Sequence, residues 1–167
     1  MSGSKSRAGA RAGGLVIALA AVLGVAGTSQ AHAQTPFQTL AGNWSGSGQI
    51  KLENGKSEAL KCRAYYTQKE SDNLGIALRC ASASNKIELR ASLNQSGHQV
   101  EGSWEERTFN AAGTVTGKVT SGRINLSITG GTFSGSMNVA ITGERHSVSI
   151  ETNGIGLKAV NISLSRG

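Results

Sequence analysis

Apolar residues recur at every second position along nearly all of the chain after residue 40, and this alternation constrains the fold more than any other feature. In the stretch from Leu40 to Leu52, Trp44 and Ile50 share one face of the extended chain, while serine, glutamine and lysine residues occupy the other face. Such a period of two is typical of a strand with one buried side. Segments with the same alternation follow at short spacing to the end of the chain.

About ten such segments are separated by turn residues, among them Asn54-Gly55 and Gly130-Gly131. The chain has a single proline and no apolar stripe of helical period, so only the polar arm at residues 35–38 is expected to form a helical turn. Short strands joined by tight turns predict an all-β fold, an antiparallel up-and-down barrel of about 8–10 strands. A β-sandwich is the alternative.

The first 33 residues have the pattern of a secretory signal peptide. A basic start precedes an apolar run from Leu15 to Val25, and the small residues Ala31 and Ala33 precede a cleavage site. A membrane anchor would need about 18 apolar residues, which is longer than this run. We therefore expect a periplasmic or secreted protein in which residues 34–167 form a single domain.

The charge pattern argues against nucleic acid as a partner. From residue 34 onward the chain has fourteen basic and ten acidic residues, a formal net charge of +4. The basic residues occur singly along the strands, whereas a nucleic-acid surface needs a clustered basic stripe with aromatic residues between. The seven aromatic residues of the full chain are also too few for the two girdles of an outer-membrane barrel, so the domain is not expected to span a membrane.

Three features together resemble known barrels: Gly42-Asn43-Trp44 at the start of the first strand, the meander of strands, and Arg166 near the end. This combination is similar to the calycin-like barrels, which include lipocalins and fatty-acid-binding proteins. The sequence also resembles small exported proteins of Gram-negative bacteria. No ligand-binding residue of these families is matched one for one.

Cys62 and Cys80 form the most specific pair of residues. In an oxidising compartment, two cysteines on facing strands are expected to form a disulfide, with Cα atoms about 4.4 to 6.8 Å apart. Direct opposition would pair Lys69 with Asn73 and leave residues 70–72 as the loop. A tetrahedral zinc site with His98 and His146 is the alternative, but no short ligand pair is present to nucleate it, so no metal is predicted.

Catalytic patterns are weak. Glu101, Glu105 and Glu106 lie near His98 and could serve acid-base chemistry, but most of these glutamates share the outward parity of a solvated face. No serine lies in a nucleophile elbow. Residues 113–118 have too few residues between the glycines for a phosphate-binding loop. We therefore predict that the protein is not an enzyme and uses no cofactor.

Four large aromatic residues, Trp44, Tyr66, Trp104 and Phe133, share the inward parity. They are either core packing or the lining of a pocket for a small apolar ligand, because such pockets use aromatic faces with few polar atoms. Inward glycines fill little space, which favours the pocket.

Arg166 also points inward, so its guanidinium is expected to lie over the Trp44 indole if the last strand pairs with the first. The predicted function is a barrel that binds a small hydrophobic molecule. A module that contacts an envelope protein, or inhibits a protease, through its loops is the alternative.

Overall fold

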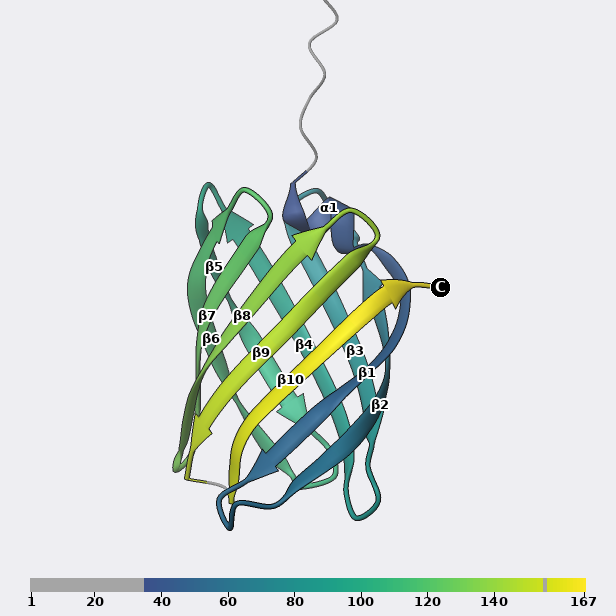
Figure 1. Ribbon diagram of the computed structural model, residues 1–167. Coiled ribbons are helices and arrows are strands. Elements are labelled where there is room, and N and C mark those ends of the chain that lie inside the picture. The colour runs from purple at the N-terminus through teal and green to yellow at the C-terminus, as the bar shows by residue number, and fades with distance from the viewer. Residues whose placement is uncertain (1–34, 155) are drawn as a thin grey trace, which may run out of the picture. The chain divides into compact units, whose positions relative to one another are not determined.

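The computed structural model describes residues 35–154 and 156–167, which form a closed barrel of ten antiparallel strands in up-and-down order (Figure 1). Each strand pairs with its neighbours in sequence, and β1 pairs with β10 to close the ring. The predicted barrel is confirmed, and the sandwich is excluded. The predicted signal peptide, residues 1–33, lies outside the described residues. The strands are β1 (Gly42–Leu52), β2 (Ser57–Thr67), β3 (Asn73–Ala81), β4 (Lys86–Ser96), β5 (Gln99–Glu106), β6 (Ala111–Thr120), β7 (Arg123–Gly130), β8 (Phe133–Thr142), β9 (Arg145–Asn153) and β10 (Leu157–Arg166).

Tight turns explain why neighbouring strands pair in order. Gly131 and Gly143 begin two-residue turns with φ values of 59° and 57°, a backbone region that favours glycine. Each turn brings the next strand back beside the previous one. The barrel therefore needs no long crossover connection.

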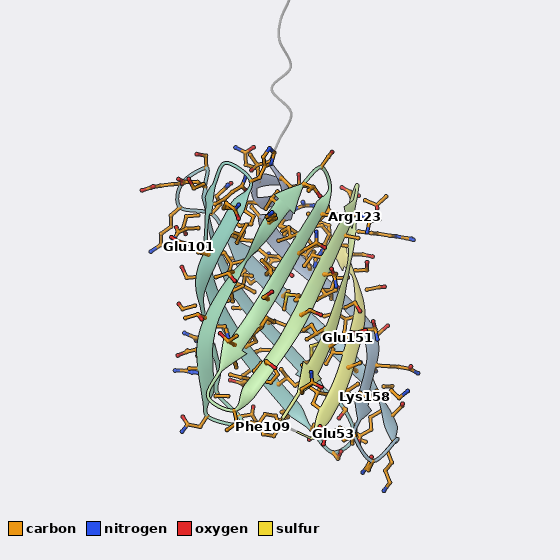
Figure 2. All side chains as sticks on the ribbon, turned by 90° about the vertical axis from the view of Figure 1, so that its left-hand side faces the viewer. Glu53, Glu101, Phe109, Arg123, Glu151 and Lys158 are labelled. Carbon is orange, nitrogen blue, oxygen red and sulfur yellow. A yellow bond between two sulfur atoms is a disulfide. The ribbon has the colours of Figure 1, made fainter. Side chains whose placement is uncertain are left out.

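The alternation seen in the sequence separates the two faces of the sheet. Apolar side chains of every strand point inward and form one core, while polar and charged residues such as Glu101, Arg123, Glu151 and Lys158 project from the outer face (Figure 2). The largest fully buried side chains are Trp44, Phe37, Leu60, Leu74, Ile124 and Leu164.

A short helix, α1 (Pro36–Leu40), precedes the first strand and lies at one end of the barrel (Figure 1). Thr35 caps it: its side chain accepts the Gln38 backbone N–H, and the Gln38 side chain accepts the Thr35 backbone N–H in return. The helical turn expected in the polar arm is confirmed. Within the described ranges, no helix is long and apolar enough to cross a membrane.

Several inward glycines allow the sheet to bend and do not create empty space. A Cβ atom on Gly46 would collide with the backbone carbonyl of Ser163, and one on Gly117 would collide with that of Asn125. These positions therefore require glycine because the neighbouring strand comes too close for any side chain. The expectation that inward glycines supply the room for a ligand is wrong at these positions.

The predicted disulfide is confirmed. Cys62 and Cys80 are bonded, and their Cα atoms lie 4.1 Å apart, slightly below the expected range. They face each other directly in the β2–β3 ladder, and this register continues to Thr67 opposite Gly75. The ladder ends there, so Lys69 and Asn73 are not paired as predicted. Because both thiols are bonded to each other, the alternative zinc site has no thiolate ligands.

Candidate ligand site in the barrel interior

One end of the barrel is closed by α1. Phe37 and Leu40 of this helix are 0% and 2% exposed, because they pack into the barrel mouth as part of the core. The Trp44 indole N–H donates to the Leu40 backbone carbonyl at 2.7 Å and so joins the helix to the first strand. The barrel is therefore closed to an apolar ligand at this end.

Arg166, at the end of β10, joins the last strand to α1. Its guanidinium carbon lies 4.5 Å from the centroid of the Trp44 ring, which confirms the predicted contact. The same guanidinium donates to the carbonyls of Ala41 and Thr39 at 2.8 and 2.6 Å, at the end of α1. Gly42 allows this approach, since a Cβ atom there would lie 2.8 Å from the guanidinium.

Replacing Arg166 by alanine should lower the free energy of unfolding by about 1–2 kcal/mol, because a cation–π contact and two charge-assisted hydrogen bonds are lost at a partly exposed site. Urea unfolding followed by tryptophan fluorescence measures this loss. Arg145→Ala, an exposed arginine on β9, serves as the control and should change stability by no more than about 0.5 kcal/mol. Equal losses in the two variants would contradict the closure role of Arg166.

Beneath Trp44, a buried polar pair lies inside the closed end. His146 on β9 is 2% exposed, its ring is 4.5 Å from that of Trp44, and its Nε2 lies 3.0 Å from the Tyr66 hydroxyl. Burial lowers the pKa of His146 to about 4, with the positive charge of Arg166 adding to the effect, and burial raises the pKa of Tyr66. Both side chains are therefore neutral at pH 7.

In the part of the chain that the structure describes, His146 carries one of two buried polar atoms at this end that lack a partner; the other is Oε1 of Gln95, near the end of β4. The His146 Nδ1 is buried and has no hydrogen-bond partner among the described residues. A buried unpaired nitrogen is costly, so a hydrogen-bonding group of a ligand would gain by reaching it. Sequence reasoning considered His146 only as a zinc ligand, although the alternation of Val148 and Ile150 already places it on the inward face.

The four aromatic residues predicted to edge one pocket lie at two separate levels. Trp44 and Tyr66 flank His146 at the α1 end, whereas Trp104 and Phe133 meet near the opposite end with ring centroids 5.5 Å apart. The Trp104 indole N–H donates to the Thr129 carbonyl at 3.2 Å. The aromatic pairs therefore bracket the interior from its two ends.

Some inward side chains are less covered than the rest of the core. Most of the half-buried apolar residues lie on β3–β4 and on β8–β9, which face each other across the ring of ten strands; Leu52, Ala111 and Leu157 lie on other strands. An inward side chain that keeps accessible surface borders space that other side chains do not fill. The residues on the two walls include Ile76, Leu78, Leu89 and Ala91 on one and Met137, Ile141 and Ile150 on the other.

Comparison with known proteins supports the fold alone. No family model matches the chain, and no curated protein matches its sequence. Rv2717c from M. tuberculosis has a similar structure, with a TM-score of 0.65, 16% identity, and coverage of 77% of this chain and 93% of that chain. The S-type phycobiliprotein lyase CPES from Guillardia theta matches with a TM-score of 0.55 and 13% identity over 78% of this chain and 90% of that one. EF1p2_mFAP2b bound to DFHBI matches with a TM-score of 0.51 and 8% identity over 81% of this chain and all of that chain, 100%.

The fold is a calycin-like barrel.

At the end of this calycin-like barrel opposite α1, the carboxylates of two glutamates accept hydrogen bonds from residues in or near the turns. Glu58 accepts the Ser82 hydroxyl at 2.5 Å and also the Ser84 hydroxyl, and these bonds lower its pKa. Glu106 accepts the backbone N–H groups of Glu88 and Phe109 at 2.6 and 2.7 Å.

The structure separates the acidic cluster near His98 that the sequence grouped together. Glu106 is buried and points inward, where both of its carboxylate oxygens bind backbone groups. Glu101 and Glu105 are exposed on the outer face of β5, and Glu105 pairs with Arg107 at 3.6 Å. Among the described residues, no group of three or more histidine, cysteine, aspartate or glutamate side chains is arranged to hold a metal ion.

Proposed function

We propose that this calycin-like barrel is an exported binding protein, and not an enzyme, that holds a small apolar molecule between the β3–β4 and β8–β9 walls. Export to the periplasm or the medium agrees with the signal-like N-terminus and with the Cys62–Cys80 disulfide, since disulfides persist in oxidising compartments.

The observation that carries the proposal is the half-buried state of inward apolar side chains on opposite walls. A fully packed core would cover Ile76 and Ala91 on one side and Met137 and Ile150 on the other as completely as it covers Leu60 or Ile124. Apolar surface of this kind favours an apolar ligand, because its burial from water is favourable by about 25 cal/mol per Å². A hydrogen-bonding group at one end of the ligand would be matched by His146 Nδ1.

One similar barrel supports this use of the fold. EF1p2_mFAP2b is bound to DFHBI in its structure, at a TM-score of 0.51 to this chain. The support is of architecture only, since the identity is 8%.

Tryptophan fluorescence tests the proposal. Trp104 lies opposite Ala91 in the β4–β5 ladder, next to the half-buried wall. Titration with oleate, cholesterol, menadione and protoporphyrin IX should give a saturable change in emission with at least one of them. If none of the four compounds binds saturably, the interior is not open to ligands of this size range.

A matched pair of variants separates interior binding from surface adsorption. Ala91→Leu adds three carbon atoms on the inward face, whereas Ala112→Leu adds the same atoms on the exposed outer face of β6. The first should weaken binding by at least tenfold because it fills the space, and the second should leave binding unchanged. Equal effects would place the ligand outside the barrel.

Contact with an envelope protein or protease through the loops remains the second candidate because one loop presents a large apolar side chain. Phe109, in the β5–β6 loop at the end opposite α1, is 63% exposed (Figure 2). The next residue, Asn110, has a φ of 51°. If all four probes fail to bind, this loop is the first surface to test.

A further inference from the structure

The outer face of β1–β4 contains two adjoining hollows. Their volumes are about 330 and about 720 Å³, and they share Ser45, Arg63, Arg79 and Glu88. No residue of β5–β9 lines either one, so both lie on the outside of the wall rather than in the barrel interior. Together they form one continuous depression, which we call the outer groove.

Small outward residues explain why this wall is hollow. Ala77 and Ala81 lie on the outer face of β3, in the middle of the wall. Their neighbours in the ladders are Tyr65 and Arg90 beside Ala77, and Lys61 and Lys86 beside Ala81. Long side chains on β2 and β4 therefore stand on either side of the two alanines, which flank Arg79 on β3.

The outer groove is strongly basic. It is lined by five basic residues and one acidic residue, Glu88, whereas residues 34–167 as a whole contain fourteen and ten. Within the described part of the chain, the single ion pair joins Arg107 to Glu105, so none of the five is paired with a carboxylate. The five are Lys61, Arg63, Arg79, Lys86 and Arg90.

Two of these cations are direct neighbours. Arg63 on β2 and Arg79 on β3 are opposite each other in the ladder. Like charges in this position destabilise a sheet. Glu88 lies opposite Arg79 on the other side but forms no ion pair with it. An anion that bridges the two guanidinium groups would remove the repulsion and could bind both in bidentate fashion.

We propose that the outer groove binds an anionic polysaccharide. Arginine and lysine would bind its acidic groups, and Asn43, Ser45 and Ser47 offer hydrogen bonds to sugar hydroxyls. Tyr65, which is 52% exposed, offers one aromatic face on which a sugar ring can stack.

Other anionic partners fit this groove less well. Single-stranded nucleic acid needs a series of exposed aromatic faces, and of the two aromatic residues that line the groove only Tyr65 is exposed, since Trp44 is 2% exposed. An acidic peptide cannot add as a strand, because the closed barrel has no free edge.

Binding to heparin, a sulfated polysaccharide, tests this inference. The full-length mature protein should bind heparin with an affinity that falls as salt is added, because cations on the protein replace the counterions of the polymer. Arg63→Gln/Arg79→Gln should weaken heparin binding by at least tenfold. Arg123→Gln/Arg145→Gln removes the same charge from β7 and β9 and should weaken it by less than twofold.

Two further measurements decide between the partners. An oligo-dT strand and poly-glutamate should bind at least tenfold more weakly than heparin at equal salt, and neutral dextran should not bind. The Arg63→Gln/Arg79→Gln variant should also be at least as stable as the parent without ligand, since it removes a repulsion. Equal effects of the two double variants, stronger binding of oligo-dT, or a destabilised Arg63→Gln/Arg79→Gln protein would each overturn the proposal. None of these outcomes depends on whether the interior binds a ligand.

Discussion

Lowering the pH from neutrality towards 4 should reduce the stability of the folded protein by about 3 kcal/mol through His146 alone. The pKa of His146 falls from 6.5 to about 4 on folding, because its ring is buried next to Trp44 and near Arg166. His146 is therefore protonated below pH 6.5 in the unfolded chain, whereas in the folded protein it stays neutral down to about pH 4. The contribution of His146 is fully present above pH 6.5 and is lost as the pH falls through this window.

Urea unfolding at several pH values measures this effect. The parent should lose stability steadily below pH 6.5, and His146→Gln should remove most of that pH dependence. His98→Gln, an exposed histidine in the β4–β5 turn, is the control and should keep the slope of the parent. The lowered pKa of Glu58 adds a separate loss as the pH falls below the ordinary value of 4.5, but it is common to all three proteins. If the stability of His146→Gln falls with pH as steeply as that of the parent, the buried His146 ring is not the source of the pH dependence.

Removing the Cys62–Cys80 disulfide should lower the free energy of unfolding by about 3 kcal/mol, because the bond closes a loop with a sequence separation of 18 in the unfolded chain. The double variant Cys62→Ala/Cys80→Ala, unfolded in urea, measures this loss. The parent with its disulfide reduced is the control, since it has no bond but keeps both sulfur atoms in the core. An unchanged unfolding midpoint in both proteins would contradict a stabilising role for the bond.

The features that sequence reasoning predicted correctly depend on strand parity and local register. The alternation from Trp44 onward indicated the barrel. The spacing of Cys62 and Cys80 gave the β2–β3 register, because a short turn leaves few ways to align two strands. The inward parity of Arg166 was enough to predict its contact with Trp44 once closure of the ring was assumed.

Other features depend on contacts between residues that are distant in sequence, and the alternation of inward and outward residues does not predict these contacts. Gly46 looked like empty space because the close approach of Ser163 is visible only after β1 and β10 pair. The arginines of the outer groove looked isolated because β2, β3 and β4 bring together residues that are spaced along the chain. Whether inward aromatic residues form one pocket or two levels likewise depends on where each strand starts.

The seam between β1 and β10 has a consequence for the order of folding. Trp44 is opposite Arg166, so the first strand stays without one of its two partners until almost the whole chain has been made. Such long-range pairing is slow, because the loop that it closes is long. Until the seam closes, β1 and β10 each present an open edge that can pair with another chain. Newly made molecules therefore pass through an interval in which they can aggregate, and that interval ends when β10 pairs with β1 and Arg166 contacts α1.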